Sequence, residues 1–359
     1  MDYRGRQSQL LSLLPANRLD GLLLSHLPNI RYLCGFTGSA GVLAVTEKGK
    51  TFFTDSRYTT QARTEVQGAR VIVGRKNPLI AAGEWLKAHH RGLRLGIEGE
   101  HLSVAAQGRL KACLSAKFRL KQAPSLVERA RMVKDPEELE RMRAAALVGV
   151  GLLDSLQHAL RPDVKECEVA AELEHAASRA GAEAMSFPTI IASGERSALP
   201  HGRASQQPIP ASGFVVCDFG VILAGYCSDM TRTLCVGRAG ELPRQAYEAV
   251  REAQELAVDS VRAGRSVGEV DHAARKSLQK KKLARYFTHS TGHGVGLEIH
   301  EAPRLAADGT EILRPGMVVT IEPGVYLPGK FGIRIEDTVV VTERGCEVLT
   351  PASKELIEL

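Results

Sequence analysis

The chain has 359 residues, and its composition excludes several classes of protein before any motif is considered. One hydrophobic core seldom serves a chain of that length, so we expect two domains. Basic residues exceed acidic ones by 47 − 41 = 6, a mild surplus spread along the chain, and we expect no nucleic-acid partner. No apolar run approaches the roughly 20 residues that cross a bilayer, so we expect no membrane segment.

The cysteines and the N-terminus indicate a cellular compartment. The seven cysteines are odd in number and widely spaced, and no C-x-x-C motif occurs. Reduced thiols fit this usage better than a disulfide framework or a zinc–thiolate site. Residues 1–21 have no uninterrupted apolar segment, so we interpret them as an amphipathic helix of the mature protein, not as a signal peptide. The sequence therefore predicts a cytoplasmic protein.

Residues 1 to about 125 alternate patterns that are typical of helices and strands, which predicts a small α/β domain. An apolar run at 20–26 predicts a buried strand. Residues 41–55 predict a hairpin that turns at Glu47–Gly49. The other expected elements are a strand at 69–74, a helix at 77–90, and a strand with a following turn at 93–100.

A long helix is expected to join this part of the chain to the next. Asp135 is a good N-cap and Pro136 a good first helical residue. An apolar stripe follows at Leu139, Met142, Ala146, Val150 and Leu153. We place the domain boundary just before this helix, with one domain at 1–127 and a second at 128–359.

The second domain mixes helices and strands, so we expect an α+β arrangement. Helices are expected at 166–180, 243–262 and 267–283, and strands at 213–220, 221–229, 230–237, 316–322 and 331–342.

Four carboxylates of this domain stand at strand positions flanked by apolar residues, where an isolated charge is strongly disfavoured. They are Asp218, Asp229, Glu322 and Glu336, and His293 stands between glycines. An N-cap, or an ion pair with Arg232 or Arg334, would explain a single case, and unrelated buried ion pairs remain the alternative for the set. The simplest charge balance is a pair of divalent metal ions, which share bridging carboxylates when about 3.5–4 Å apart. Oxygen and imidazole ligands suit Mn²⁺, Co²⁺ or Fe²⁺.

Four segments that contain these residues resemble the signatures of the pita-bread metallopeptidases, the family of methionine aminopeptidase, aminopeptidase P and prolidase. The segments are CDFGVILAGYCSDMTRT (217–233), GHGVGLEIHE (292–301), IEPGVY (321–326) and GIRIEDTVVV (332–341). The resemblance covers residues 139–359, and all segments occur in the expected order. It implies a pita-bread catalytic domain whose metal ligands are Asp218, Asp229, His293, Glu322 and Glu336.

The resemblance also implies how these ligands are shared. Asp229 and Glu336 would bridge both ions, Asp218 would complete one site, and His293 with Glu322 would complete the other. The expected ions are two Mn²⁺, with Co²⁺ or Zn²⁺ as alternatives. The glycines at 292, 294 and 296 would let the backbone run close to this centre.

The N-terminal part indicates which branch of the family the chain resembles. Residues 29–62 resemble the creatinase-like N-terminal domain, especially that of aminopeptidase P. Methionine aminopeptidases usually lack this domain, and creatinase lacks the metal ligands, so the resemblance implies the proline-specific branch and a homodimer. Asp55, Arg57 and Tyr58 would reach a partner subunit's site or simply end a strand, and we favour the structural interpretation.

Further residues match those that this branch uses for substrate. His201 and His300 are expected both to bind substrate and to take part in catalysis, with His300 donating a hydrogen bond to the oxyanion. His289 and Phe187 are expected to bind substrate, enclosing the proline ring. Structural or surface positions are the alternative for the three histidines.

Two arginines and one glutamate complete the candidate site. Arg334 matches a family arginine near the metals, and a catalytic role and a salt bridge to Glu336 both remain open. Arg304 matches an arginine that in prolidases faces the substrate carboxylate, with a plain surface arginine as the alternative. Glu322 is expected to move the proton from the nucleophile to the leaving nitrogen.

We therefore predict a two-metal exopeptidase of the aminopeptidase P type, whose partners are small peptides with proline at the second position. An Xaa-Pro dipeptidase (prolidase), which acts only on dipeptides, is the alternative. A metal-free pita-bread binding module is the remote alternative, and bound metal would exclude it.

Overall fold

The computed structural model describes residues 1–359. The chain divides into two compact units, Met1–Arg131 and Met132–Leu359, and each contains both helices and sheets, as the α/β prediction requires. Residue 127, the boundary predicted from the sequence, lies in helix α6 (Leu126–Arg131). No helix is long and apolar enough to cross a membrane.

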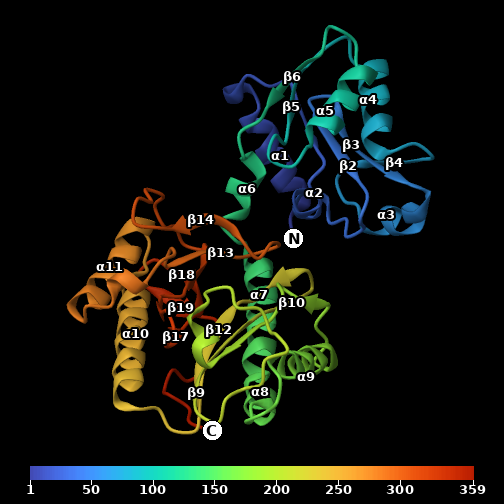
Figure 1. Ribbon diagram of the computed structural model, residues 1–359. Helices are drawn as coiled ribbons and strands as arrows, with labels where there is room; N and C mark the ends of the chain where they lie inside the picture. The colour runs from blue at the N-terminus through green and yellow to red at the C-terminus, as the bar shows by residue number, and fades with distance from the viewer. The chain divides into compact units, whose positions relative to one another are not determined.

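The first unit is built on one six-stranded sheet in the order β4-β3-β2-β1-β5-β6 (Figure 1). The strands are β1 (Gly21–Leu24), β2 (Val42–Thr46), β3 (Gly49–Asp55), β4 (Arg70–Gly74), β5 (Arg94–Ile97) and β6 (Arg119–Gln122). The central β1–β2–β3 pairs are antiparallel, and β4, β5 and β6 add in parallel. The hairpin and the strands predicted in this unit are confirmed.

The helices of this unit are α1 (Tyr3–Leu13), α2 (Leu27–Cys34), α3 (Thr59–Glu65), α4 (Pro78–His89), α5 (Val104–Cys113) and α6. Local caps fix two of them, since the Asn77 side chain accepts from Leu79 N and the Ser103 side chain from Ala106 N. Helix α4 packs on β2 and β3 and against α5, which closes one core of the unit. Asp55 caps a short 3₁₀ turn and pairs with Arg57 at 2.9 Å.

Thirteen short strands form four sheets in the second unit. The sheets are β12-β9-β8, β11-β10-β7, β14-β13-β15-β18-β19 and β16-β17, and all of their pairs are antiparallel. The strands are β7 (Ala184–Met185), β8 (Ile190–Ser193), β9 (Gly213–Phe219), β10 (Val221–Leu223), β11 (Tyr226–Cys227), β12 (Met230–Val236), β13 (Gly292–Gly294), β14 (Glu301–Leu305), β15 (Val318–Ile321), β16 (Gly324–Leu327), β17 (Phe331–Arg334), β18 (Asp337–Val341) and β19 (Cys346–Val348).

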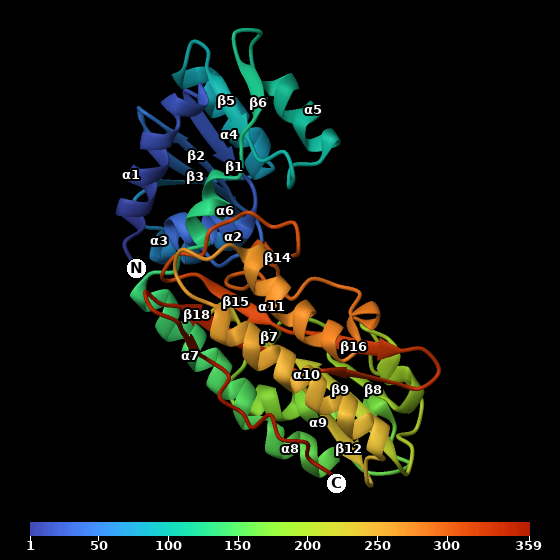
Figure 2. The same ribbon diagram turned by 90° about the vertical axis from the view of Figure 1, so that its left-hand side faces the viewer.

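Helices lie on both sides of these strands (Figures 1 and 2). They are α7 (Pro136–Gly151), α8 (Leu153–Ala159), α9 (Glu166–Arg179), α10 (Glu241–Ser260) and α11 (Val267–Lys280). Helices α7, α8 and α9 share one hydrophobic core with β8, β9 and β12, and α10 and α11 share another with β15, β17 and β18. The middle of the unit is therefore strand, shielded by helices on two sides.

Three sequence predictions in this unit need correction. The single strand expected at 221–229 is two strands, β10 and β11, which pair with each other as a hairpin. The long helix expected after Asp135 breaks at Leu152 into α7 and α8. Of its expected apolar stripe, only Met142 and Ala146 are buried. The single strand expected at 331–342 is two strands, β17 and β18, which pair in different sheets. Glu336 lies at the point where the chain changes from one sheet to the other.

Candidate metal centre and active site

The five predicted ligand residues reach one place from separate strands. Asp218 lies in β9 and Asp229 directly precedes β12, which pairs with β9. His293 is the middle residue of β13, and Glu322 directly follows β15, which pairs with β13. Glu336 stands between β17 and β18. Strands of three sheets therefore bring together residues that lie far apart in the sequence.

Their polar atoms lie within a few ångströms of one another. One carboxylate oxygen each of Asp218, Asp229 and Glu336 lies within 4.8 Å of the other two. The Nε2 atom of His293 is 3.6 Å from Oδ2 of Asp229 and 3.4 Å from Oε1 of Glu322. All five side chains line one cavity of about 550 Å³. The arrangement is a compact set of oxygen and nitrogen ligands at the wall of a cavity.

Three of the carboxylates each have one oxygen without a hydrogen-bond partner in the protein. Oδ1 of Asp218, Oδ1 of Asp229 and Oε1 of Glu336 are buried and accept no hydrogen bond from the protein. An unpartnered buried acceptor costs about 1–3 kcal/mol, and more when it is charged. Divalent cations coordinated by these oxygens would remove that cost, so the donor set fits metal ions.

His293 is oriented as a metal ligand is oriented. Its Nδ1 lies 3.0 Å from the carbonyl oxygen of Gly294, so Nδ1 carries the proton and donates it. The neutral ring then directs the Nε2 lone pair toward the oxygens of Asp229 and Glu322. Burial lowers the pKa of His293, which favours this neutral form. A lone pair that faces ionised carboxylates is repulsive unless a proton or a metal ion lies between them.

The electrostatics of the carboxylates agree with this reading. Burial raises the pKa of Glu322 to about 8. Burial, together with the charges of neighbouring carboxylates, raises the pKa values of Asp229 and Glu336 well above their usual range. Protein groups alone therefore do not stabilise the ionised cluster, and bound cations would restore the ionised forms.

Arg334 is the arginine that forms an ion pair with one of these carboxylates, whereas Arg232 donates to the backbone carbonyl oxygen of Glu336. The Nη2 of Arg334 donates to Oδ2 of Asp218, Nε donates to Thr231 Oγ1 at 3.1 Å, and Nη1 donates to Tyr326 Oη at 2.7 Å. Its ion pair is with Asp218 and not with Glu336, the partner considered from the sequence. The structure thus makes Arg334 a buried framework residue, 3% exposed, that orients one ligand.

His289 is held by Tyr326, the residue that also contacts Arg334, and by the backbone of Ser290. Its Nδ1 lies 2.8 Å from the carbonyl oxygen of Ser290, and its Nε2 lies 3.0 Å from Tyr326 Oη. Nδ1 therefore carries the proton, and Nε2 accepts from the tyrosine hydroxyl. Burial, with the charge of Arg334, lowers the pKa of His289 to about 4, so the ring is neutral at neutral pH.

The remaining predicted residues line the same cavity. They are Phe187, His201, His300 and Arg304. The rings of His300 and His293 stand edge to face with centroids 4.4 Å apart. Burial lowers the pKa of His300, so this ring is neutral as well at neutral pH. Every residue that the sequence analysis nominated is thus brought to one cavity.

Two glycines of the motif are required by neighbouring strands. A Cβ atom on Gly292 would lie 1.8 Å from the carbonyl oxygen of Thr320 in β15, and one on Gly294 would lie 2.3 Å from that of Ala302 in β14. These contacts are far shorter than any real Cβ contact, so β13 fits between its neighbours only with glycine at both positions. This close packing fixes the backbone of His293.

Sequence reasoning missed several residues of the site. Tyr326, Thr231, Glu301 and Arg203 belong to it, through hydrogen bonds to the framework or as residues that line the cavity. Thr231 Oγ1 donates to Oε2 of Glu336 at 2.7 Å. A signal existed for Thr231, because it lies two residues after Asp229, and residues two apart in extended chain lie on the same face.

Family models match nearly the whole chain. Residues 140–343 match the model of metallopeptidase family M24, and residues 6–133 match the model of the creatinase/prolidase N-terminal domain.

Individual proteins agree with the family models. An Xaa-Pro dipeptidase of Pyrococcus horikoshii is 35% identical over 350 residues, which cover 97% of each chain. The solved structure of an Xaa-Pro dipeptidase from Bacillus anthracis has 39% identity and a TM-score of 0.96 over 100% of both chains. That of an X-Pro aminopeptidase from Thermotoga maritima has 33% identity and a TM-score of 0.88, covering 99% of this chain and 100% of the other.

Proposed function

The chain belongs to metallopeptidase family M24, with a creatinase/prolidase N-terminal domain, and we propose that it hydrolyses the peptide bond between an N-terminal residue and a following proline. One observation carries the proposal: five metal-type ligands and the histidines of the proline-specific branch line a single cavity. The relatives named Xaa-Pro dipeptidase and X-Pro aminopeptidase support it.

The two metal ions used by this family would be held by Asp218, Asp229, His293, Glu322 and Glu336. Bound there, a metal pair supplies Lewis acidity toward the carbonyl oxygen and a nucleophilic water at neutral pH. We propose Mn²⁺, because carboxylate oxygens dominate the donor set and no cysteine takes part.

Glu322 is the residue placed to move protons. The Thr320 hydroxyl donates to its Oε1 at 3.3 Å, which leaves Oε2 to take the proton of the attacking water. Once the peptide bond breaks, the proline nitrogen is a secondary amine and needs a proton. Glu322 lines the cavity and would deliver that proton from Oε2.

The cavity wall suits a proline ring. Phe187, Pro188, Ile190 and Ile299 give it apolar surface. A proline nitrogen carries no N–H in the substrate, so the site must recognise ring shape without that donor. The neutral ring of His300 has one N–H, which we propose stabilises the oxyanion as the carbonyl is attacked.

The length of the substrate has two candidates. The primary proposal is an Xaa-Pro aminopeptidase, which accepts residues after the proline, because residues 29–62 resemble the corresponding part of aminopeptidase P. The second is an Xaa-Pro dipeptidase. It is favoured by Arg304, which lines the cavity where a substrate carboxylate could be bound, and by the dipeptidase relatives.

Steady-state kinetics with two peptides test this proposal. The protein is stripped of metal, loaded with Mn²⁺, and assayed with Ala-Pro and Ala-Pro-Ala. The aminopeptidase proposal predicts efficient cleavage of the tripeptide, and cleavage of Ala-Pro alone would establish the dipeptidase. If metal-loaded protein cuts neither, the proline assignment is wrong.

We further propose a cytoplasmic homodimer. All seven cysteines are unpaired, which suits a reducing compartment. The dimer follows from the family resemblance, and light scattering coupled to size exclusion would test it.

A further inference from the structure

The segment between β8 and β9 carries part of the candidate active site. We call residues 194–204 the His201 loop; it begins with a 3₁₀ turn at Gly194–Ala198. His201 and Arg203 of this loop line the active-site cavity. The carbonyl oxygen of Pro200 accepts from Nη1 of Arg334 at 3.0 Å. The position of the loop therefore matters to the site in two ways.

The His201 side chain does not fix its own position. Its imidazole is exposed at the cavity and makes no hydrogen bond to another residue of the chain. The backbone next to it is held at Pro200, and the loop has a second long-range contact at Ser197, whose Oγ accepts from Gly332 N at 2.8 Å. The position of the imidazole is therefore determined by the contacts that hold the loop backbone.

A single buried carboxylate holds both ends of the loop. Glu166, the first residue of α9, is 0% exposed. Its Oε1 accepts from Ser193 N at 2.8 Å and Ser193 Oγ at 2.9 Å, just before the loop. Its Oε2 accepts from Ser205 N at 3.1 Å and Ser205 Oγ at 2.6 Å, just after the loop. We call this arrangement the Glu166 clamp.

Arg196 completes the clamp from inside the loop. Its Nε lies 3.2 and 3.0 Å from the two oxygens of Glu166, and its Nη2 donates to the carbonyl oxygen of Arg203 at 2.8 Å. The carboxylate thus joins residues 193, 196 and 205, and Arg196 extends the connection to residue 203. Charge-assisted hydrogen bonds of this kind are the strong ones in proteins.

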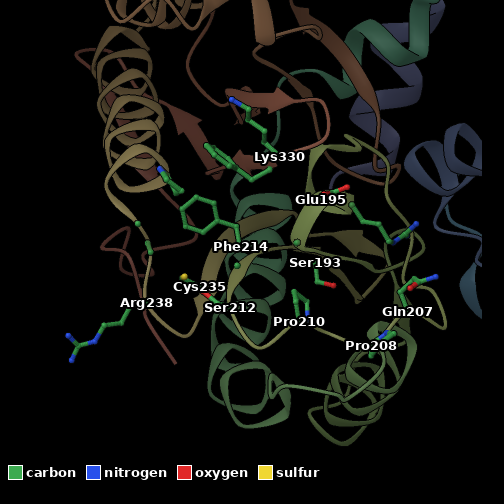
Figure 3. Close-up of a pocket in the computed structure, with 17 residues that line it drawn as sticks. Ser193, Glu195, Gln207, Pro208, Pro210, Ser212, Phe214, Cys235, Arg238 and Lys330 are labelled. Carbon is green, nitrogen blue, oxygen red and sulfur yellow. The ribbon is translucent and has the colours of Figure 1, made fainter.

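A cavity borders the start of the loop on the side away from Glu166. Ser193, Glu195 and Arg196 line a second cavity of about 520 Å³, together with Phe214 and Phe331 (Figure 3). Ser197, in the same turn, is 0% exposed and packs on Gly332 of β17, so it anchors the middle of the loop. Without the clamp, residues 193–196 would have room to shift into the cavity.

We propose that Glu166 is a positioning residue for the reaction: the clamp places the His201 loop, and through it the His201 imidazole, at the active-site cavity. The inference rests on the proposed function. An amide in place of the carboxylate keeps one acceptor oxygen and turns an N–H₂ group toward the backbone N–H of either Ser193 or Ser205. One end of the loop then loses its anchor. Arg196 is left without its charge partner, but its side chain is 31% exposed and can be hydrated.

A double-mutant cycle tests the proposal. Glu166→Gln, His201→Ala and the double variant are loaded with Mn²⁺ and assayed with the better of Ala-Pro and Ala-Pro-Ala. Glu168→Gln is the matched control, because Glu168 is exposed two residues away on the same helix. We expect Glu166→Gln to lower kcat/KM at least tenfold in the presence of His201, but no more than threefold in the His201→Ala background. The control should stay within twofold of the wild type.

Other outcomes overturn the inference. An equal loss in both backgrounds would mean that Glu166 acts through general stability, and an unchanged Glu166→Gln would mean that the clamp does not position the loop. Should Glu166→Gln fail to fold, Ser193→Ala removes one hydroxyl donor to Glu166, and Ser205→Ala removes the other together with an acceptor of the exposed Gln207 N. Each is expected to lower kcat/KM by at least twofold, and wild-type activity in both would refute the clamp.

Amide hydrogen exchange separates this inference from the proposed function. Residues 194–204 should exchange at least tenfold faster in Glu166→Gln, or in the serine variants, than in the wild type and in Glu168→Gln. Unchanged exchange would overturn the clamp. Wild-type protein that binds two metals and cuts neither peptide would instead refute the proposed function, and the exchange result would still decide whether Glu166 holds the loop.

Discussion

Replacing Asp337 by asparagine should destabilise the second unit more than replacing any exposed carboxylate. Asp337 is 1% exposed and follows Glu336 directly. Its Oδ1 accepts from Nη2 of Arg232 at 2.8 Å, and its Oδ2 accepts from Nε2 of Gln254 at 2.8 Å and Nζ of Lys354 at 3.1 Å. This carboxylate therefore joins β12, β18, α10 and the C-terminal segment behind the candidate metal centre.

The structure sets the size of the effect. Removing one partner of a buried ion pair costs about 3–5 kcal/mol. Arg232 keeps several backbone acceptors, among them the carbonyl oxygens of Thr231 and Ala352, and asparagine keeps one acceptor oxygen. We therefore expect Asp337→Asn to lower the free energy of unfolding by about 3 kcal/mol, the lower end of that range.

The same contact predicts a pH dependence. Burial alone would raise the pKa of Asp337, but the charges of Arg232 and Lys354 outweigh it and lower the pKa below its usual value. A carboxyl group with a lowered pKa in the folded state stabilises the fold above its unfolded-state pKa, which is about 3.9. That contribution is lost as the pH falls through the folded-state pKa. The difference between wild type and variant should therefore shrink below about pH 4.

Urea unfolding of the metal-free proteins measures both effects, at pH 7 and again at pH 3. Glu343→Gln, at an exposed position, is the control and should match the wild type within about 0.5 kcal/mol. An Asp337→Asn variant as stable as this control at pH 7 would refute the reasoning. The reasoning would also be refuted if the variant's loss of unfolding free energy relative to the wild type were the same at pH 3 as at pH 7.

Three further predictions concern the centre itself. Asp229→Asn should bind fewer than two metal ions per chain by elemental analysis and lose its peptidase activity, and two bound ions would contradict the assignment of Asp229 as a ligand. Gly292→Ala, whose Cβ would lie 1.8 Å from a backbone oxygen, should lower the free energy of unfolding by about 3 kcal/mol or more, as measured by thermal unfolding. Gly151→Ala, with open space at its Cβ, should not be destabilised, and similar losses in both would refute the steric argument. If Arg304 binds a substrate carboxylate, Arg304→Ala should raise KM for Ala-Pro by roughly tenfold or more, since a hydrogen bond to a charged group contributes about 1.5–3 kcal/mol. The KM for Ala-Pro-Ala should be unaffected. Equal effects on both peptides would exclude that role.

Local features of the fold were predictable because their causes are local. The cap at Asp135 follows from neighbouring residues: its Oδ1 accepts from Glu138 N at 2.9 Å, and Glu138 Oε2 accepts from Asp135 N at 3.0 Å. The 41–55 hairpin likewise depends on an alternating pattern with a turn in the middle.

The buried face of α7 was not predictable, because its cause is distant in the sequence. Glu138 is 2% exposed, which a hydrophobic stripe would never suggest. The hydroxyl of Tyr226 donates to its Oε1 at 2.9 Å, from 88 residues away. A polar residue that gains such a partner can be buried, and it then turns the helix away from its most apolar face.

Within the candidate site, too, some residues were predictable from the sequence and others were not. Carboxylates at strand ends, flanked by apolar residues, identified the ligand candidates, because an isolated buried charge is so unfavourable. The framework around them gave no such signal. Tyr326 meets His289 across 37 residues, and Glu166 meets Ser205 across 39, and only the packed sheets and helices bring these pairs together.

Metal-dependent hydrolysis of a proline dipeptide tests the central claim most directly. Chelated protein and the same protein with Mn²⁺ restored are compared on Ala-Pro, Ala-Pro-Ala and Ala-Ala, with bound metal counted in each sample. The account predicts two ions per chain, cleavage of at least one proline peptide only when they are bound, and little cleavage of Ala-Ala. Cleavage without metal, or a fully loaded protein that cuts no proline peptide, would contradict it.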